Sequence, residues 1–288
     1  MPGYDYYLAT SRNIGWFAER EQEKLKNKKV AIGGLGGVGG GHLLTLVRLG
    51  ILNFHIADPD IFDYSNLNRQ VGSDLRTLGN NKVDVLEKMA KDINPELNIK
   101  KFPEGVTEEN IDDFLDGVDI YIDGLDFFVI ELRRKVFDAC RKKGIPAVSA
   151  AAMGMGSACI VFMPDGITFD QYFRLEGCSR EEQLLRFLIG LSPKMAQTKY
   201  LADPDGVDLK NNRVPSTAIA CRLCNGIVGA QTVKILLNRG DIVTAPKSIQ
   251  FDAYLNKMYN VWVPFGNANP LQKIKLAAAR KILQKEKM

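Results

Sequence analysis

Three glycines near the N-terminus, Gly34, Gly36 and Gly39, have the spacing of a loop that binds a nucleotide phosphate. They follow the short apolar stretch 28–34 and open a segment with helical periodicity, so a helix N-terminus would offer its unpaired N–H groups to the anion. Asp58 comes 22 residues after Gly36, close to the ~20 expected for an acid that accepts hydrogen bonds from a ribose. The pattern predicts a nucleotide site without specifying the nucleotide.

Two different reactions use such a loop: hydride transfer with a dinucleotide, and activation of a carboxylate by ATP. Two cations downstream of the ribose acid, Arg69 and Lys82, favour the second. A dinucleotide keeps its pyrophosphate, whereas ATP releases pyrophosphate, and cations on its β- and γ-phosphates stabilise the charge that develops. Spacing alone leaves a plainer interpretation open, in which Arg69 is a surface arginine and Lys82 starts a helix.

The segment SNLNRQ, which follows DPD and lies downstream of GLGGVG, resembles the ubiquitin-activating superfamily, in particular the bacterial ThiF/MoeB/HesA group. The similarity covers roughly residues 8–150 and returns weakly at 215–240. Proteins of this group activate small sulfur-carrier proteins with ATP. The resemblance implies a nucleotide-binding set that comprises Gly34, Gly36, Gly37, Gly39, Asp58, Asn66, Arg69, Gln70 and Lys82.

The resemblance also implies a role for individual side chains. Asp58 would hold the ribose, while Arg69 and Lys82 would act in catalysis at the phosphates. Asp126, in DGLDFF, matches an acid that holds Mg²⁺. Arg12, in TSRNIG, matches an arginine that acts in catalysis at the ATP site of a partner subunit, so the resemblance implies a homodimer.

The implied reaction is adenylation. A carboxylate, from the C-terminus of a ubiquitin-like or sulfur-carrier protein or of a peptide, attacks the α-phosphate of ATP; pyrophosphate leaves and an acyl adenylate forms. The enzyme must align the reacting groups and neutralise charge. One alternative is a superfamily relative that activates and dehydrates tRNA threonylcarbamoyladenosine. An NAD-dependent oxidoreductase and a catalytically silent scaffold of the same fold are two others.

The cysteines and one loop depart from the family pattern. Sulfur-carrier activators usually hold a structural zinc with two C-x-x-C pairs, whereas this chain has one, Cys221 and Cys224, on one face of an apolar helix. Because four thiolates close a zinc site and two do not, we expect these thiols to pack in the core, with a redox, metal or thioester role as the alternatives. Cys178, before a polar helix, is a candidate thioester cysteine or an incidental loop residue. Phe127 and Phe128 replace the asparagine expected after the magnesium-binding acid.

The elements that must position these residues alternate between strand and helix, which predicts an α/β fold with a Rossmann-like, doubly wound and mostly parallel sheet. Apolar or alternating runs that end in glycines or acids mark the strands, and amphipathic runs mark the helices. The predicted strands are 28–34, 52–58, 97–103, 118–124 and 145–152, and the predicted helices are 37–51, 82–94, 107–115 and 129–144.

The alternation ends beyond the last of these strands. A strand and turn at 157–169, an apolar helix at 217–240 stopped by Gly240, and a hairpin at 247–265 predict an antiparallel C-terminal extension. Segment 170–214 predicts a short helix followed by a mobile polar loop. The expected organisation is an N-terminal helical arm at the dimer interface (1–27), one adenylation domain (28–265) and a basic C-terminal helix (266–288).

The composition is that of an ordinary globular protein, with 288 residues, 45% of them hydrophobic and 25% charged. No apolar run reaches the ~20 residues of a membrane helix, and the N-terminus lacks the pattern of a signal peptide, so we expect a cytoplasmic protein without a membrane partner. The net charge of +4 is concentrated in 271–288, which holds six cations and one anion. The near-neutral remainder does not favour a nucleic-acid partner. The two histidines, His42 and His55, are expected to be structural.

Overall fold

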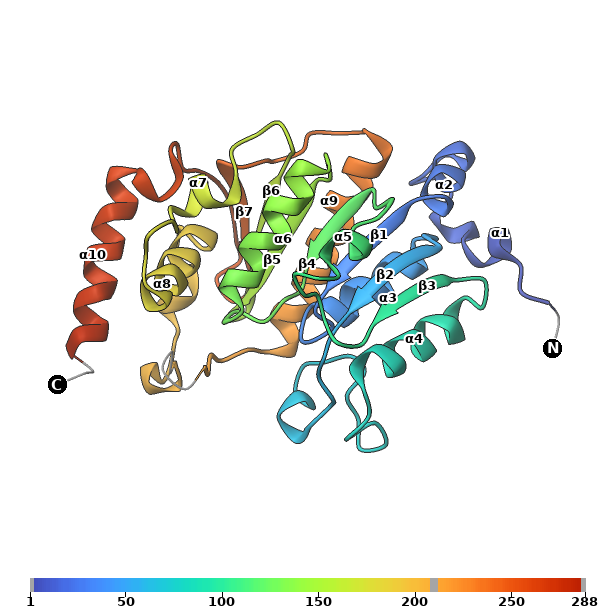
Figure 1. Cartoon of the computed structure of the whole chain (residues 1–288), viewed down its shortest axis with the longest axis horizontal. Helices are drawn as coiled ribbons and strands as arrows, with labels where there is room; N and C mark the ends of the chain where they lie inside the picture. Colours follow the sequence, from blue (N-terminus) through green and yellow to red (C-terminus); the bar gives the residue numbers. More distant parts are fainter. Residues whose placement is uncertain (1–2, 208–211, 286–288) are drawn as a thin grey trace.

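The computed structural model describes residues 3–207 and 212–285. Within these residues, eight strands form one sheet in the order β3-β2-β1-β4-β5-β6-β7-β8 (Figure 1). The strands are β1 (Lys29–Gly33), β2 (Asn53–Ala57), β3 (Asn98–Phe102), β4 (Ile120–Asp123), β5 (Ala147–Met153), β6 (Gly156–Phe162), β7 (Lys247–Asp252) and β8 (Lys257–Trp262). The helices are α1 (Tyr6–Ala9), α2 (Glu19–Lys26), α3 (Gly39–Arg48), α4 (Lys82–Ile93), α5 (Ile111–Phe114), α6 (Ile130–Lys142), α7 (Phe169–Phe173), α8 (Arg180–Leu191), α9 (Ala218–Leu237) and α10 (Pro270–Lys285).

The five strands from β3 to β5 run parallel, and β6, β7 and β8 add on in antiparallel pairings. The predicted mostly parallel, doubly wound sheet with an antiparallel C-terminal extension is therefore confirmed. After β3 the chain returns to place β4 on the other side of β1. The strand order reverses between β1 and β4, and in such sheets ligands bind in the crevice at the carboxyl ends of those strands.

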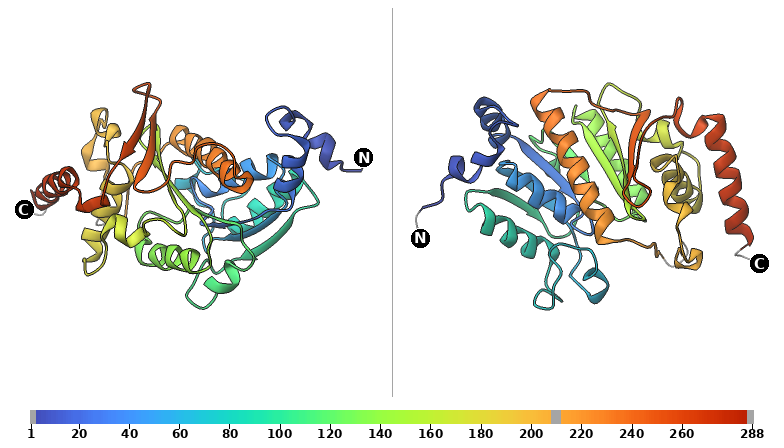
Figure 2. Two further views of the ribbon diagram at one scale, coloured as in Figure 1. Left: turned by 90° about the horizontal axis from the view of Figure 1, so that it is seen from above. Right: turned by 180° about the vertical axis from the view of Figure 1, so that it is seen from behind.

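The sheet separates two hydrophobic cores because successive side chains of a strand point to opposite faces. Val30 and Ile32 of β1 face the core that α3, α4 and α9 complete, whereas Ala31 faces the core built with α5, α6, α7 and α8. Figure 2 shows α9 with α3 and α4 on one face and α6 on the other. Burial on both faces explains why β1 is a nearly continuous apolar run.

The apolar helix ends earlier than the sequence predicts. α9 stops at Leu237, and Asn238 caps it in the left-handed conformation with φ 50°. Asparagine tolerates that conformation because its short polar side chain bonds locally. Gly240, with φ 78°, lies two residues beyond the cap, so the prediction that it stops the helix was wrong.

The helix predicted at 107–115 shortens to α5. Reciprocal capping hydrogen bonds do form at its start: the Thr107 N–H donates to Asn110 Oδ1 at 2.8 Å and the Asn110 N–H donates to Thr107 Oγ1 at 3.3 Å. The segment between these two residues remains a turn, and the chain turns again at Gly117, with φ 62°, to enter β4. The space between two turns leaves room for one helical turn only.

Segment 170–214 is more helical than predicted. It contains most of α7 and all of α8, a twelve-residue helix. Leu184 and Phe187 of α8 belong to the core on the α6 face. The part without a long helix begins at Ser192, and four residues of that part, 208–211, lie outside the described residues. The predicted short helix is therefore joined by a second one, and α8 continues from its polar start, REEQ, into an apolar second half.

Both terminal segments pack against the rest of the chain. The Tyr6 hydroxyl donates to the Gly50 carbonyl at 2.8 Å, which fixes α1 at the C-terminal end of α3. At the other end of the molecule, α10 buries Leu276 against Leu185 and Ile189 of α8. Among the helices in the described residues, none is both long and apolar enough to cross a bilayer.

Candidate active site

The glycine loop leaves the carboxyl end of β1 and enters α3. Gly34 has φ 85°, and its N–H donates to the Ala57 carbonyl at 2.7 Å, which ties the loop to β2. A side chain at Gly39 would approach the Gly34 carbonyl oxygen to 1.8 Å, and one at Gly34 would approach the Gly124 carbonyl oxygen to 2.2 Å. These two glycines are therefore required by backbone contact between the loop, the start of α3 and the end of β4.

Gly36 and Gly37 serve a different purpose, because the space beside them is bounded by polar side chains. A Cβ at Gly36 would lie 3.7 Å from Gln70 Nε2, and one at Gly37 would lie 3.6 Å from Arg69 Nε. The sequence separation between these pairs exceeds thirty residues, yet the fold brings the SNLNRQ segment directly to the glycine loop. This juxtaposition is the one that the nucleotide-binding prediction requires.

Asp58, at the end of β2, is buried beneath the loop. Its Oδ2 accepts from the Leu35 N–H at 2.6 Å and its Oδ1 from the Asp60 N–H at 2.9 Å. Burial raises the pKa of Asp58, and the nearby Lys82 ammonium and these two backbone donors oppose the rise. The carboxylate thus fixes the glycine loop in the protein alone, a structural role in addition to the ribose contact that the family resemblance implies.

Lys82, the first residue of α4, is the cation of this site. Its side chain is only 6% exposed, and its Nζ lies 2.8 Å from Asp60 Oδ2 and 3.9 Å from Asp58 Oδ1. A lysine at the start of a helix is unfavourable with respect to the helix dipole, so burial beside two carboxylates is not what a merely helix-starting surface lysine would adopt. Lys82 does start a helix, as the plainer interpretation has it, but it is also buried beside two carboxylates, and its role at the phosphates stays a prediction.

The SNLNRQ segment, residues 65–70, begins inside a short 3-10 turn, Tyr64–Asn66. Asn66 is buried and its Oδ1 accepts from the Asp63 N–H at 3.1 Å, so in the protein alone it caps its own turn. Arg69 is half-buried and donates through Nη1 to the Ser65 carbonyl at 2.7 Å. That bond occupies one edge of the guanidinium and holds the side chain beside the glycine loop. A free surface arginine would not be held in this way.

Gln70 supplies an independent test of whether a ligand fits. It is buried, and its Oε1 has no hydrogen-bond partner among the described residues, while its Nε2 faces Gly36. An unsatisfied buried polar atom costs about 1–3 kcal/mol, and such atoms are found where a ligand or water completes the bonding. A glycine cradle without side chains, two cations and an unsatisfied amide fit a phosphorylated nucleotide.

Asp126 lies on the loop that leaves β4, next to the glycine loop through the Gly34–Gly124 contact. Its side chain is exposed, and its Oδ1 accepts from the Phe128 N–H at 2.9 Å. No cluster of three or more metal-ligating side chains exists in the part of the chain that is described. A single exposed carboxylate suits Mg²⁺, which is commonly bound by one or two carboxylates together with substrate phosphates.

Sequence reasoning missed the pair that holds this loop. Asp123 ends β4 and is 3% exposed, and Arg133 of α6 is 2% exposed; Arg133 Nε donates to Asp123 Oδ2 at 2.8 Å. Arg133 Nη2 also donates to the carbonyls of Leu125 at 2.6 Å and Asp126 at 3.0 Å, and the Ser149 hydroxyl donates to Asp123 Oδ2 at 2.7 Å. One guanidinium therefore fixes the backbone of the loop that carries Asp126.

Arg12 lies elsewhere. It is exposed in the short 3-10 turn Ser11–Asn13, and the adjacent Asn13 donates through Nδ2 to the Arg48 carbonyl at 3.4 Å, at the last turn of α3. The glycine loop is at the first turn of the same helix, about 15 Å away at 1.5 Å per residue. Arg12 is therefore remote from the site of its own chain.

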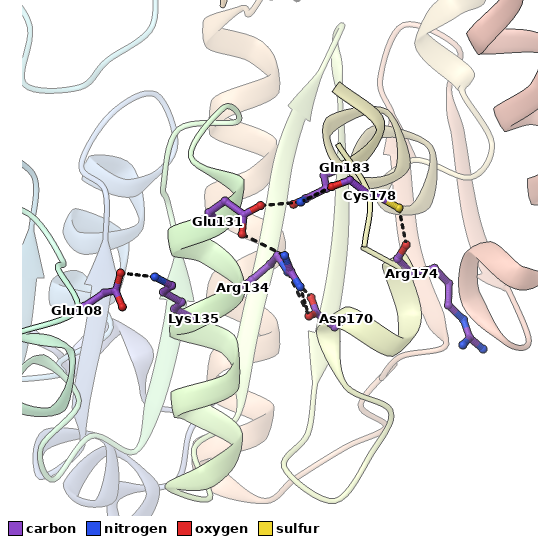
Figure 3. Close-up of polar contacts among 8 residues, drawn as sticks. All are labelled: Glu108, Glu131, Arg134, Lys135, Asp170, Arg174, Cys178 and Gln183. Atoms are coloured by element: carbon purple, nitrogen blue, oxygen red, sulfur yellow. Dashed lines mark hydrogen bonds and ion pairs between the residues drawn. The ribbon is translucent and has the colours of Figure 1, made fainter. Parts of the chain in front are cut away.

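Cys178 lies one residue before the Ser179 cap of α8, beside the first turn of α6 (Figure 3). Gln183 Nε2 donates to the Cys178 carbonyl at 3.0 Å and to Glu131 Oε1 at 2.6 Å, which links the two helices. The thiol is half-buried and donates to the Arg174 carbonyl at 3.5 Å. Its role as a thioester cysteine stays a prediction.

The Cys221 and Cys224 thiols and the His42 ring pack inside, as predicted. Cys221 and Cys224 are buried, and Cys224 Sγ lies 3.1 Å from Ser157 Oγ. A Cβ at Gly37 would lie 3.2 Å from Cys221 Sγ, so this thiol forms part of the wall behind the glycine loop. His42 is buried against Asn225, and burial lowers the pKa of His42 to about 3.

Small residues beyond the glycine motif are explained by packing. A side chain at Gly41 would meet Asn225 Oδ1 of α9 at 2.1 Å, and one at Gly40 would meet Leu86 Cδ1 of α4 at 2.6 Å. At the β5–β6 turn, side chains at Gly154 and Gly156 would meet the Tyr200 hydroxyl and the Phe251 carbonyl at 2.5 Å. These additional glycines allow close approach of neighbouring elements.

Known proteins share this fold and parts of this sequence. The chain is 36% identical over 148 residues to the tRNA threonylcarbamoyladenosine dehydratase of Bacillus subtilis (strain 168). The matched region covers 51% of this chain and 56% of that protein. It is 33% identical over 133 residues to the adenylyltransferase and sulfurtransferase UBA4 of Saccharomyces cerevisiae (strain RM11-1a). Here the matched region covers 46% of this chain and 30% of that protein. The chain thus spans about half, or less, of these curated relatives.

The fold is also that of E. coli MccB. The structure of MccB with ATP superposes with a TM-score of 0.63 and 19% sequence identity, over 88% of this chain and 69% of that chain. A model of the ThiF family matches residues 10–271, nearly the whole chain. The family model covers the glycine loop, both cations and α9, and with this match the resemblance seen in the SNLNRQ segment is confirmed: the chain belongs to the ThiF family.

Proposed function

We propose that this chain is an ATP-dependent adenylyltransferase that activates a carboxylate, the C-terminus of a small ubiquitin-like or sulfur-carrier protein or of a peptide. The observation that carries the proposal is the convergence of Arg69 and the buried Lys82 on one glycine loop. A dinucleotide does not need two cations there, whereas ATP releases pyrophosphate. Membership of the ThiF family and the activity of the relative UBA4 support the same reaction.

In the proposed mechanism, the glycine loop and the start of α3 bind phosphate oxygens through backbone N–H groups. Arg69 and Lys82 bind the β- and γ-phosphates and stabilise the charge on the departing pyrophosphate. Lys82 would exchange part of its ion pair with Asp60 for the phosphates. The carboxylate attacks the α-phosphate in line, the bond to pyrophosphate breaks, and an acyl adenylate forms. Mg²⁺, held by Asp126 and the phosphates, would supply further charge neutralisation.

ATP–pyrophosphate exchange tests this proposal. We expect labelled pyrophosphate to enter ATP only when a carboxylate substrate is added, because exchange requires reversible formation of the adenylate. Candidate substrates are ubiquitin-like proteins and peptides, each compared with a version whose C-terminus is amidated. Exchange with the free carboxylate and none with the amide would support the proposal. No exchange with any carboxylate, together with tight NAD binding, would contradict it.

A second candidate follows from the Bacillus relative, whose substrate is tRNA threonylcarbamoyladenosine. The carboxylate of that nucleoside would take the place of the protein C-terminus, and the same cations would serve. The two candidates separate in one assay, because tRNA that carries threonylcarbamoyladenosine would stimulate ATP consumption only under the second.

We also propose that the enzyme is a homodimer in which Arg12 acts at the ATP site of the other subunit. Support comes from the exposure of Arg12 and of the neighbouring apolar side chains Leu8 and Trp16, which are 72% and 83% exposed. Large exposed apolar side chains in a group are typical of interfaces. The N-terminal segment would then serve the partner, since it lies far from the site of its own chain.

Mixing two inactive variants tests this arrangement. Arg12→Ala and Lys82→Met are each expected to lose exchange activity as pure homodimers. After the two are unfolded and refolded together, about a quarter of the wild-type sites should recover, because half of the dimers are heterodimers with one intact site. The control mixes Arg20→Ala with Lys82→Met, so that every subunit keeps Arg12. About half of the wild-type activity should remain in it, because half of the subunits keep Lys82. Absence of recovery in the first mixture would argue against a role in trans.

A further inference from the structure

A second cleft lies far from the glycine loop, between the C-terminal helix α10 and the α7–α8 unit. Its volume is about 360 Å³, within the range of ligand-sized cavities. Four cations line it together with one amide and two apolar residues: Arg174, Arg186, Lys273, Arg280, Asn267, Ala268 and Leu276. These residues come from the end of α7, from α8, from the turn after β8 and from α10, so the cleft exists only in the folded chain.

One carboxylate organises two of the four cations. Glu182 of α8 pairs with Arg186 Nε and with Arg280, whose Nε lies 2.9 Å from Glu182 Oε2. These arginines lower the pKa of Glu182, with Arg280 contributing most, so the carboxylate stays ionised at neutral pH. The cleft therefore carries an excess of three positive charges. The two guanidinium groups are fixed in place by one shared partner, which leaves other N–H groups on each available.

The remaining two cations have no ion-pair partner in the described part of the chain. Arg174 ends α7 in the left-handed conformation with φ 58°, and its carbonyl accepts from Arg186 Nη1 at 2.6 Å. Figure 3 shows its side chain pointing away from Cys178 and from the Arg134–Asp170 pair. Lys273 is exposed on α10. Only one acid, Glu182, offsets the four cations, so the cleft keeps a positive potential that attracts an anion.

Neutral hydrogen bonds hold the walls at a fixed spacing. Asn267 Nδ2 donates to the Phe173 carbonyl at 2.9 Å and to the Arg186 carbonyl at 2.8 Å. Gln272 Nε2 donates to the Ile189 carbonyl at 3.1 Å, and Leu276 is 2% exposed against α8. α10 is thus docked on α8 by buried neutral contacts in addition to the Arg280–Glu182 ion pair. The backbone that carries the cations is fixed by these bonds, and the side chains of Arg186 and Arg280 are also held by Glu182, which lowers part of the entropic cost of binding.

We propose that this cleft binds a phosphoryl group of a small molecule, at a site separate from the glycine loop. Arginine matches phosphate oxygens with two parallel N–H groups, and lysine adds a point charge. The cations converge from three elements, which suits the several oxygens that a tetrahedral phosphoryl group presents in different directions. A carboxylate offers two oxygens in one plane and would leave part of this donor set unused. The inference does not depend on the proposed function.

The test is calorimetric titration of the Arg69→Ala protein, in which the glycine loop is weakened, with pyrophosphate, AMP and the dicarboxylate glutarate. We expect pyrophosphate, AMP or both to bind, and glutarate to bind at least about tenfold more weakly. The double variant Arg174→Glu/Lys273→Glu should reduce phosphoryl binding by about tenfold or more, because it removes two charge-assisted contacts. Neither side chain has a partner in the described fold, so the melting temperature should not fall.

The matched control is Lys247→Glu/Lys257→Glu, which makes the same change in net charge at exposed lysines of β7 and β8. It should bind the phosphoryl probes as the parent does. Equal weakening by both double variants, or equal affinity for glutarate, would overturn the proposal. So would an RNA oligonucleotide that displaces pyrophosphate at far lower concentration, since the ligand would then be a polymer. In the Arg69-intact chain the Arg174→Glu/Lys273→Glu variant should retain full ATP–pyrophosphate exchange, which separates this proposal from the adenylation proposal.

Discussion

Arg69→Ala is expected to reduce ATP–pyrophosphate exchange by about 10²–10³-fold, the loss typical for removal of one preorganised donor to developing charge. The side chain adjoins Gly37 of the phosphate loop and is aimed there by its bond to the Ser65 carbonyl. It supports little else, since its other bond goes to the neighbouring Asn68 side chain. The free energy of unfolding should therefore change by less than about 1 kcal/mol, as for surface substitutions in general.

Arg76→Ala is the matched control. Arg76 lies in the same connection between β2 and α4, its side chain is 89% exposed, and its partner is Asp74, two residues away. Its removal should leave exchange unchanged within the error of the assay. If Arg69→Ala retained exchange, or if both variants lost it equally, the assignment of the triphosphate to this loop would be wrong. Urea titration of both variants excludes loss of folding as the cause.

Most of the sheet is predictable because its signals are local. β1 and β2 are apolar runs that end in Gly33 and just before Asp58, and helices with a clear apolar face separate the parallel strands. α8 was predicted only as a polar helix after Cys178, and its apolar side was missed for the opposite reason. It begins with four polar residues, REEQ, and the polar segment that follows residue 200 has turn chemistry throughout. Local composition does not reveal that the apolar side of α8 packs on α6.

The candidate site also has residues that local sequence predicts and features that depend on tertiary structure. Gly34 and Gly39 are necessary for backbone contacts that any loop of this type makes, so their spacing alone predicts them. Arg69 and Lys82 were predicted by chemistry and by family resemblance, but the burial of Lys82 beside Asp58 is a tertiary fact. The nearest partner of Lys82, Asp60, belongs to the DPD segment, but nothing in the sequence pairs it with a lysine that follows later in the chain.

Arg133 is the clearest case of what sequence patterns hide. On α6 it belongs to the run RRK, in which Arg134 and Lys135 form surface ion pairs with Asp170 and Glu108 (Figure 3). Three consecutive cations on a helix normally predict that this part of the helix faces solvent. Only the position of α6 against the end of β4 turns the first of the three inward, where Asp123 balances its charge. A buried, strand-ending acid followed ten residues later by an arginine is the one signal that was available.

Arg133→Met is expected to lower the free energy of unfolding by about 3–5 kcal/mol, because it leaves the Asp123 carboxylate buried without its counter-ion. Methionine retains much of the side-chain volume, so cavity formation contributes little. The carbonyls of Leu125 and Asp126 also lose their donor, so the loop that carries Asp126 should lose its fixed conformation. Urea unfolding measures the first effect, and the concentration of Mg²⁺ that supports half-maximal exchange measures the second.

The neighbouring Arg134→Met provides the control within the same helix turn. Arg134 pairs with Asp170 and Glu131, whose side chains are 40% and 57% exposed, so water replaces the lost partner. The expected loss is about 0–1 kcal/mol, the range of exposed ion pairs. The double variant Asp123→Leu/Arg133→Met removes both charges and should recover much of the stability lost in Arg133→Met while leaving the Mg²⁺ requirement raised, because the two carbonyls still lack a donor. If stability and the Mg²⁺ requirement recovered together, Arg133 would act through charge balance alone and not by positioning the loop.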